Sequence, residues 1–180
     1  RNKETDTPLP MSPYALSKLI GEEYCKLFTR TYGLATIILR YFNVYGPGQR
    51  DDSSYATVIP LFKKALATGK QPIMYGTGAQ TRDFVYIDDV VQANIKALNA
   101  PKKASGEVFN IGSGKKTPIT DLYKIMQEIW GTHKKPLFKK QRKGDIHTSV
   151  ASTAKAKKLL GYESVFSLKK GLQNYHAVAK

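Results

Sequence analysis

Apolar and polar positions along the chain follow first a helical and then a strand-like spacing. Between Pro13 and Gly33 the apolar residues recur every three or four positions, which predicts a helix that ends at the glycine. A near-continuous apolar run over 34–42 follows and is typical of a strand buried on both faces of a parallel sheet. The predicted helix would bury one stripe, formed by Leu16, Ile20, Tyr24, Leu27 and Phe28.

The rest of the chain repeats this alternation of short strands and helices, which predicts an α/β fold. Asp88 is expected to cap one of the helices and Gly131 to end another. Strands are expected at 72–75, 84–87 and 107–111. Helices are expected at 55–66, 88–98, 120–130, 152–160 and 167–178.

Tyr14 and Lys18 are the clearest candidates for chemistry. Ser12 is a suitable N-cap and Pro13 suits the first turn of a helix, so the pair falls at a helix start. Residues four apart share a helix face, and an ammonium close to a phenol favours the ionised phenol. The pair can therefore form a base, with further help from a bound cation. The alternative is an ordinary amphipathic helix that carries a tyrosine and a lysine on its surface.

Five motifs occur in the order found in one enzyme family. They are Ser-Pro-Tyr-Ala-Leu-Ser-Lys at 12–18, Arg-Tyr-Phe-Asn-Val-Tyr-Gly-Pro at 40–47, the run 75–90 with its Arg-Asp-Phe, Phe-Asn-Ile-Gly-Ser-Gly at 109–114, and Arg-Lys-Gly-Asp at 142–145. Together they resemble the extended short-chain dehydrogenase/reductases, the nucleotide-sugar epimerase and dehydratase family. Within that family the chain is most similar to UDP-glucose and UDP-N-acetylglucosamine 4-epimerases.

The resemblance implies an α/β fold: the C-terminal part of a Rossmann-type, doubly wound parallel sheet, plus a small α/β substrate-binding lobe. Residues 1–46 and 88–113, together with 166–180, would belong to the NAD-binding domain. Residues 47–87 and 114–165 would form the nucleotide-sugar lobe. The helix that carries Tyr14 and Lys18 resembles one that pairs with its own copy, so a homodimer is expected.

NAD is the cofactor that the resemblance implies. Tyr14 would take the proton from the C4 hydroxyl of a UDP-sugar and return it after a 4-keto intermediate, and Lys18 would reach the nicotinamide ribose. Tyr41 and Phe42 would lie beside the nicotinamide. The expected reaction is C4 epimerisation of UDP-glucose and UDP-galactose, with the N-acetyl forms as further candidates.

Four residues would hold the diphosphate, the ribose and the sugar. Arginine forks suit phosphate oxygens, and Arg82 and Arg142 match the family's phosphate contacts. Asp145 matches a carboxylate that accepts hydrogen bonds from ribose hydroxyls, and Asn43 matches an amide close to the diphosphate-sugar. Plain structural roles are the alternatives: a surface ion pair for Arg82 with Asp83, a turn for Asp145, and an Asx-turn for Asn43.

Three more residues are implied near the two ends of the substrate. Val58 and Tyr75 match positions that flank the uracil. Ser149 matches the residue that limits the space beside the sugar C2 substituent, and a small side chain there would admit an N-acetyl group.

A glycine-rich dinucleotide loop is missing from the sequence, which contains no Gly-x-x-Gly-x-x-Gly. We therefore expect this loop and the family's catalytic Ser or Thr to lie in an N-terminal half outside these 180 residues, and we expect the isolated chain to be inactive. Gly112-Ser113-Gly114 also follows a predicted strand. The resemblance assigns it to a strand-end turn near the substrate cleft.

Composition fits a globular enzyme except for its formal net charge of +15. The lysine clusters are expected to form solvated faces, and binding to nucleic acid is disfavoured because the basic run 134–143 holds only one aromatic residue. A basic, non-catalytic RNA-binding relative stays open as an alternative, as does a dehydratase or decarboxylase of the same family.

The remaining residue types set further expectations. No apolar stretch reaches the length of a membrane span, and the one cysteine excludes an internal disulfide and fits a reducing cytoplasm. The three histidines have no ligand spacing, so no metal site is expected.

Overall fold

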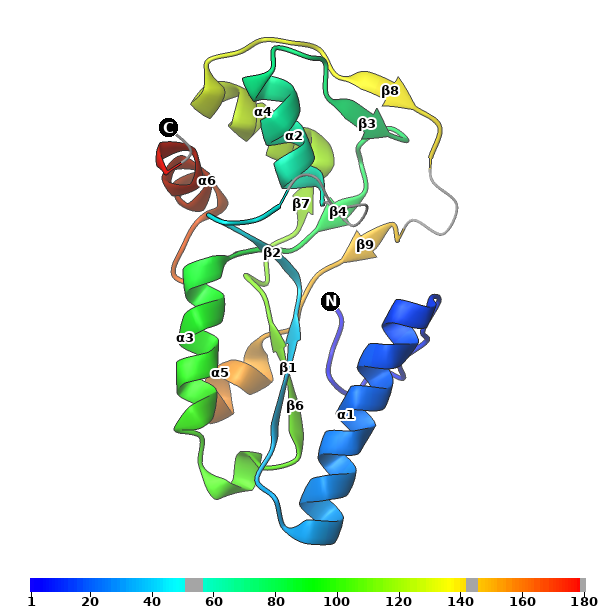
Figure 1. The fold of residues 1–180 in the computed structure, drawn as a ribbon, viewed down its shortest axis with the longest axis vertical. Coiled ribbons are helices and arrows are strands. Elements are labelled where there is room, and N and C mark those ends of the chain that lie inside the picture. Colours follow the sequence, from blue (N-terminus) through cyan, green and yellow to red (C-terminus); the bar gives the residue numbers. More distant parts are fainter. Residues whose placement is uncertain (51–56, 142–145, 179–180) are drawn as a thin grey trace.

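The computed structural model describes residues 1–50, 57–141 and 146–178 as two stacked lobes (Figure 1). The helices are α1 (Pro13–Tyr32), α2 (Val58–Ala67), α3 (Ile87–Leu98), α4 (Ile119–Trp130), α5 (Ala154–Leu160) and α6 (Leu168–Ala177), with a 3-10 turn η1 (Lys102–Ala104). The strands are β1 (Ile37–Tyr41), β2 (Asn43–Tyr45), β3 (Ile73–Tyr75), β4 (Thr81–Arg82), β5 (Phe84–Tyr86), β6 (Glu107–Ile111), β7 (Thr117–Pro118), β8 (Leu137–Lys139) and β9 (Thr148–Ser149).

Parallel pairing organises the lower lobe. β1 runs beside β6 in a register that places Ile37 opposite Glu107 and Tyr41 opposite Ile111, and β2 continues beside β5. Helix α1 lies on one side of these strands, and α3 and α5 lie on the other (Figure 1). This arrangement confirms the predicted α/β class with parallel strands.

The expected burial of the 34–42 run is wrong. Strand β1 forms within that run, but Ile38 is its only fully buried residue. The reason is that only one edge of β1 is paired among the described residues, with β6, so the side chains of β1 lack neighbours from a second adjacent strand.

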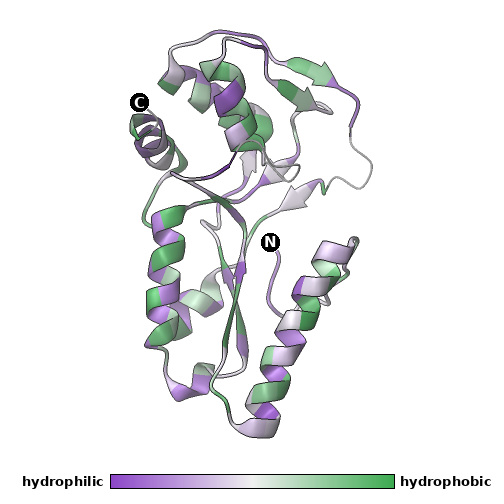
Figure 2. Ribbon diagram, in the orientation of Figure 1, coloured by the Kyte–Doolittle hydropathy of each residue, from purple (hydrophilic) through white to green (hydrophobic). Residues whose placement is uncertain are grey.

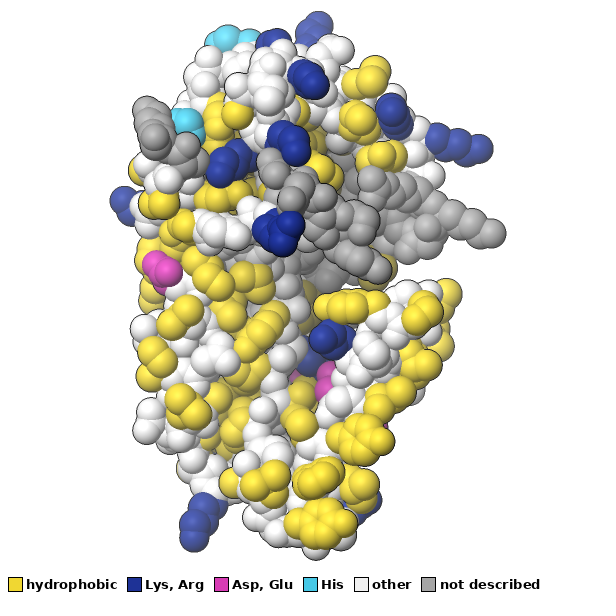
Figure 3. All heavy atoms as spheres, viewed as in Figure 1, with side chains coloured by type: hydrophobic (Ala, Val, Ile, Leu, Met, Phe, Trp, Pro, Cys, Tyr) yellow, Lys and Arg dark blue, Asp and Glu magenta, His cyan; other side chains and the backbone are white. Residues whose placement is uncertain are grey.

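Helix α1 has the predicted ends. The hydroxyl oxygen of Ser12 accepts a hydrogen bond from the Ala15 N–H, and Gly33 adopts the left-handed conformation that ends the helix. The buried stripe is wrong, because no residue of α1 is buried in this chain. Apolar positions alternate with polar ones along α1 (Figure 2), and hydrophobic side chains gather on its open surface (Figure 3).

Other helices start close to their predicted residues. Helix α3 has Tyr86 as its N-cap, so the prediction that Asp88 caps it is wrong, although Asp88 lies in the first turn, where a carboxylate suits the helix dipole. Helix α2 begins at Val58 and α4 at Ile119. Gly131 ends α4 in the left-handed conformation, as predicted.

Two hydrophobic clusters form the core. The upper cluster joins α2, α4 and α6, and the lower one joins β5, β6, α3 and α5. Helix α5 packs against β6 and α3, and helix α6 packs against α4 and β5. Upper-cluster members with less than 2 % exposure include Ile59, Phe62, Leu122, Met126 and Leu172.

Within the described ranges, no helix is long and apolar enough to cross a membrane. The same ranges contain no group of three or more His, Cys, Asp or Glu residues placed to hold a metal ion.

Candidate active site

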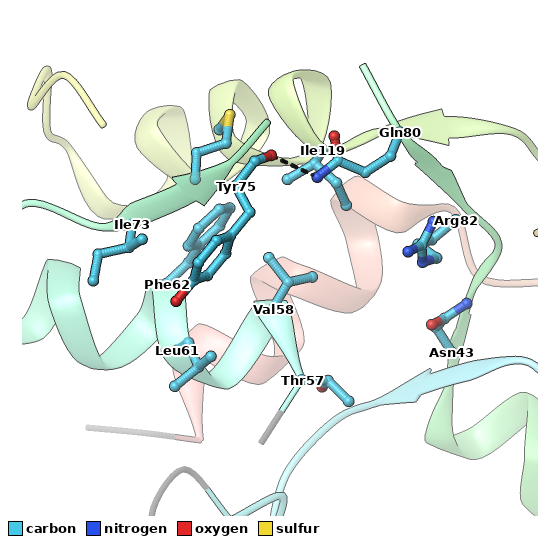
Figure 4. A pocket seen from close by; sticks show the side chains of 11 residues that line it. Asn43, Thr57, Val58, Leu61, Phe62, Ile73, Tyr75, Gln80, Arg82 and Ile119 are labelled. Carbon is cyan, nitrogen blue, oxygen red and sulfur yellow. Dashed lines mark hydrogen bonds between the residues drawn. The ribbon is translucent and has the colours of Figure 1, made fainter. Parts of the chain in front are cut away.

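One pocket brings together residues from five separate segments of the chain. It encloses about 250 Å³ and lies where β2, α2, β3 and β4 meet (Figure 4). Four residues named from the sequence line it: Asn43, Val58, Tyr75 and Arg82. The structure therefore places these four predicted contacts around a single space.

The pocket has one polar end and one apolar end. Asn43 and Arg82 lie together at the polar end, whereas Phe62, Ile73 and Tyr75 lie at the other (Figure 4). Charged and amide side chains at one end suit an anion, and aromatic and aliphatic side chains at the other suit a flat ring. The arrangement thus fits an elongated ligand with a charged middle and an aromatic group.

Asn43 is fixed by the residue that links β4 to β5. Its backbone N–H donates to the Asp83 carbonyl at 3.0 Å, and its side-chain Nδ2 donates to the same oxygen at 3.1 Å. The side-chain amide thus makes a contact across to a residue 40 positions away in sequence, which is not the local hydrogen bond of an Asx-turn. These two hydrogen bonds fix the orientation of the side-chain amide at the start of β2.

Arg82 ends β4 and reaches along the edge of the pocket. Its Nη1 donates to the carbonyls of Thr81, at 2.9 Å, and Ile146, at 2.6 Å. In the register of β4 with β9, Arg82 lies opposite Ser149. The residue expected at the sugar C2 substituent is therefore next to the expected phosphate contact.

The alternative of a surface ion pair between Arg82 and Asp83 is wrong. Asp83 is completely buried, and its carboxylate accepts hydrogen bonds from Ser113, Gly114 and Ala151. The side chains of Arg82 and Asp83 have different surroundings, because adjacent residues in extended backbone point to opposite faces. The Gly112–Gly114 turn binds this internal carboxylate, in agreement with its assignment to a strand-end turn.

The apolar end is held by α2 and β3. Val58 lies in the first turn of α2, and Phe62 is buried one turn later. The side-chain Nε2 of Gln80 donates to the Tyr75 carbonyl at 2.9 Å, drawn as the dashed line in Figure 4. Gln80 and Thr57 line the pocket, but sequence reasoning missed both of them; the position of Gln80 between Tyr75 and Arg82 was the available signal.

Tyr14 and Lys18 lie together at the start of α1, as their spacing predicts. The Lys18 ammonium is 5.2 Å from the centre of the Tyr14 ring, close enough for a cation–π contact. Tyr14 is 66 % exposed. The start of α1 is at the same end of the lower lobe as the carboxyl end of β1, facing the upper lobe (Figure 1). Parallel α/β sheets bind ligands at this end.

An ion pair ties α1 to β1. The Arg40 guanidinium donates from Nε and Nη2 to the two carboxylate oxygens of Glu22, each at 2.7 Å. The hydrogen bond to Glu22 raises the pKa of Arg40. Because the pair is bidentate and partly buried, it fixes the helix that carries Tyr14 relative to the strand that ends beside Asn43.

The two residues expected beside the nicotinamide face different surroundings. The Tyr41 hydroxyl forms a 2.9 Å hydrogen bond with Oδ1 of Asn94 on α3, on the opposite side of the strands from α1. Phe42 links β1 to β2, and its N–H donates to the Ile111 carbonyl. Strand alternation from Arg40, which reaches α1, puts Phe42 rather than Tyr41 on the side of Tyr14. Arg142 and Asp145 lie outside the described residues.

A comparison with known proteins identifies the family. The model of the NAD dependent epimerase/dehydratase family matches residues 1–112. The chain belongs to this family. A putative UDP-glucose 4-epimerase of Methanocaldococcus jannaschii is 42 % identical over 164 residues, which cover 91 % of this chain and 52 % of the relative. The chain thus spans about half the length of the curated relatives that it matches.

Solved epimerase structures share the fold. The UDP-glucose 4-epimerase of Thermotoga maritima, crystallised with UDP-glucose, matches with a TM-score of 0.93 and 39 % identity over 99 % of this chain and 58 % of that one. A UDP-N-acetylglucosamine 4-epimerase of Methanobrevibacter ruminantium matches with a TM-score of 0.92 and 34 % identity, over 97 % and 55 % of the two chains. UDP-glucuronate 4-epimerases and dTDP-glucose 4,6-dehydratases are also among the matches. These structures confirm the Rossmann-type fold class.

The residues present fit one half of the family's NAD cofactor. A phenol, an ammonium and an aromatic ring at the carboxyl end of β1 are groups that can bond to ribose hydroxyls and cover a nicotinamide face. The sequence contains no glycine-rich dinucleotide loop for the pyrophosphate. The fit is therefore to the nicotinamide and its ribose.

Proposed function

We propose that this chain forms the substrate-binding part and the catalytic tyrosine of an NAD-dependent UDP-sugar 4-epimerase. The observation that carries this proposal is the pocket that unites Asn43, Val58, Tyr75 and Arg82. Its polar and apolar ends match the pyrophosphate and the uracil of a UDP-sugar. The similarity to an epimerase crystallised with UDP-glucose supports the same conclusion.

Each pocket residue then has a chemical role. Arg82 binds the pyrophosphate through its planar guanidinium, and Asn43 donates to the phosphate or sugar oxygens beside it. Tyr75 and Val58 enclose the uracil. Arg142 and Asp145 are proposed to complete the phosphate and ribose contacts, in agreement with the family motif that they form.

Tyr14 is the proposed acid and base of the reaction. Its phenolate would take the proton from the sugar C4 hydroxyl, and the resulting phenol would later return that proton to the carbonyl oxygen of the 4-keto sugar. Lys18 keeps a positive charge beside the phenol and binds the ribose of the cofactor. NAD, when bound, supplies a reversible hydride acceptor. Phe42 would help to enclose the nicotinamide, whereas Tyr41, which was also expected there from the sequence, faces α3.

Ser149 is proposed to set the substrate range. Its side chain is small and lies opposite Arg82 in the β4–β9 register, so space is left beside the bound sugar. We therefore propose that both UDP-hexoses and their N-acetyl forms are substrates. A dehydratase or decarboxylase would share the pocket and the tyrosine, since dehydratases are among the similar structures.

The exposed face of α1 supports a homodimer. Leu16, Ile20 and Tyr24 are each at least 47 % exposed and lie along one helix face. A second copy of α1 would cover these apolar side chains, which supports the predicted pairing through the helix of Tyr14 and Lys18. A cytoplasmic location and the inactivity of the isolated chain stay predictions.

Proton NMR of UDP-galactose and of UDP-N-acetylglucosamine, each incubated with NAD and the full-length protein, tests the proposal. Conversion at C4 of both sugars is expected. Conversion of UDP-galactose alone would overturn the role given to Ser149. No C4 conversion of either sugar, but loss of water from dTDP-glucose or of CO2 from UDP-glucuronate, would replace the epimerase by the dehydratase or the decarboxylase.

A further inference from the structure

A buried carboxylate lies directly behind the polar end of the pocket. Asp83 separates Arg82, the last residue of β4, from Phe84, the first residue of β5, and none of its surface is exposed. Oδ1 accepts hydrogen bonds from the Ser113 N–H at 2.7 Å and the Ser113 hydroxyl at 2.6 Å. Oδ2 accepts from the N–H groups of Gly114 at 2.9 Å and Ala151 at 3.0 Å. Each carboxylate oxygen therefore faces two donors.

These contacts join the segments that carry the candidate substrate residues. Ser113 and Gly114 follow β6, and Ala151 comes two residues after Ser149 on β9. The backbone carbonyl of Asp83 accepts both hydrogen bonds of Asn43 at the start of β2. One residue thus connects the ends of β2, β4, β6 and β9.

The turn approaches Asp83 and Ala151 so closely that position 112 requires glycine. A Cβ atom on Gly112 would lie 2.7 Å from Oδ2 of Asp83 and 2.9 Å from Cβ of Ala151. The successive N–H groups of the turn form an anion-binding nest, and the anion in it is the chain's own carboxylate. The N–H groups of this turn are therefore taken up by the Asp83 carboxylate and do not bind the substrate phosphates. The phosphates would instead bind on the side of β4 that carries the Arg82 side chain.

We propose that Asp83 is a positioning residue for the substrate pocket: its carboxylate, held in the Gly112–Gly114 turn, fixes the backbone that presents Arg82 and Asn43 to the diphosphate. This inference rests on the proposed function, because it takes the pocket to bind a UDP-sugar. It assigns no contact with substrate to Asp83.

The chain provides a matched control in a second buried carboxylate. Asp89 on α3 is 1 % exposed and accepts hydrogen bonds from the Ser164 hydroxyl and from the N–H groups of Val165 and Phe166. It fastens the segment before α6 and does not line the pocket. Removal of either charge should lower the melting temperature, but only Asp83 should affect binding at the pocket.

The test compares Asp83→Asn with Asp89→Asn in the full-length protein. An asparagine at 83 places its NH2 group against at least one backbone N–H donor whichever way the amide is turned, so the junction must shift. At a temperature where circular dichroism shows all proteins folded, calorimetry with UDP should give at least tenfold weaker binding for Asp83→Asn and binding within twofold of wild type for Asp89→Asn.

Steady-state kinetics separates positioning from a merely structural role. Loss of binding alone raises KM at nearly unchanged kcat, whereas a smaller folded fraction lowers kcat at unchanged KM. We expect a KM at least tenfold higher for Asp83→Asn. Wild-type UDP affinity and KM in folded Asp83→Asn would overturn the inference, as would a lower kcat with wild-type KM. Absence of UDP binding by the wild type would instead overturn the proposed function, and the inference with it.

Variants of Ser113 keep the test decisive if Asp83→Asn does not fold. Ser113→Ala removes the hydroxyl donor to Oδ1, and Ser113→Thr retains it. UDP binding about threefold or more weaker for the alanine variant, restored by threonine, is expected. Equal UDP affinity in wild type and Ser113→Ala would contradict the role of the junction.

Discussion

The pocket and helix α1 carry the two halves of the candidate site in contrasting surroundings. The pocket rests on a core of fully buried side chains such as Phe62 and Leu122, and its polar residues donate hydrogen bonds to backbone carbonyls. Helix α1 has no buried residue and leaves Tyr14 66 % exposed. The described residues thus form the pocket among themselves, whereas the helix that bears the catalytic candidate leaves its apolar face exposed.

The contrast has a physical basis in how each part is held. Helix α1 is attached to β1 by the Glu22–Arg40 ion pair, and to the residue before β1 by the hydrogen bond between the hydroxyls of Thr29 and Thr36. Polar contacts of this kind fix the direction of a helix but bury little apolar surface, which supplies most of the free energy of folding. The pocket lobe should therefore be the stable part, and α1 should gain stability when its apolar face is covered.

The largest expected effect separates chemistry from binding. Tyr14→Phe removes the hydroxyl that takes and returns the C4 proton, so kcat should fall about 10²–10⁴-fold, the usual range for general acid–base catalysis. UDP affinity should stay within twofold, because the pocket lies on other elements. NMR turnover and calorimetry on the full-length protein check both values.

Tyr32→Phe is the matched control for this prediction. It removes another exposed phenol from the far end of α1 and should retain wild-type kcat. Full activity of Tyr14→Phe would refute the assignment of the base, and a loss of UDP binding in this variant would contradict the separation of the two regions.

Truncation of leucines compares the packing of the two regions. Leu122→Ala in α4 should lower the free energy of unfolding by about 2–5 kcal/mol, because the side chain is fully buried in the upper cluster. Leu16→Ala in α1 should cost less than about 1 kcal/mol in the monomeric chain, because Leu16 is 47 % exposed. Urea unfolding monitored by circular dichroism measures both.

The loss in free energy of unfolding caused by Leu16→Ala should depend on protein concentration. If a second copy covers α1, the cost of this substitution should grow at protein concentrations where sedimentation shows a dimer, while the cost of Leu122→Ala in α4 stays constant. A cost for Leu16→Ala that is already large in the monomer would show that α1 is packed against its own chain.

Arg82→Lys tests the polar end of the pocket alone. The lysine keeps the charge but loses the planar fork, and charge-assisted hydrogen bonds contribute about 1.5–3 kcal/mol, so UDP binding should weaken about 10–100-fold. Arg30→Lys, in the last turn of α1, should leave UDP binding unchanged. Equal affinities of the two variants in calorimetry would remove Arg82 from the site.

The sequence predicted the bounds of helices and strands more reliably than it predicted which of their faces are buried. Ser12 and Gly33 mark the ends of α1, because helix capping depends on residues close together in the sequence. The strand expected at 107–111 matches β6, because a short apolar run is likewise a local pattern. The stripe on α1 was predicted to be buried, but periodicity reports only that a face is apolar and not what covers it.

The site was predictable only in part for the same reason. The motifs named Asn43, Val58, Tyr75 and Arg82, all of which line the pocket. Sequence reasoning missed the role of Asp83, because its partners lie 30 and 68 positions away and only the folded chain brings them together. Contacts of this range depend on strand register, which a single sequence specifies weakly for strands as short as β4 and β9.

Alkaline titration tests the burial of one tyrosine in each of the two clusters. Burial raises the pKa of Tyr45 in the upper cluster, and burial likewise raises the pKa of Tyr162 in the lower one. Above about pH 10 these phenols ionise when the chain is unfolded but stay protonated when it is folded. The unfolded state then binds fewer protons, so stability falls as pH rises, by up to about 1.4 kcal/mol per pH unit for each tyrosine.

Phenylalanine substitutions isolate this titration from other alkaline effects. Tyr45→Phe and Tyr162→Phe remove the phenols, whose hydroxyls donate to the carbonyls of Leu168 and Gly112, so each should cost some stability at pH 7 but flatten the decline between about pH 10 and 11. Urea midpoints of wild type and both variants at pH 7, 10 and 11 measure the slopes. An unchanged slope in both variants would show that these phenols are accessible to solvent. This result would contradict their burial in the two clusters.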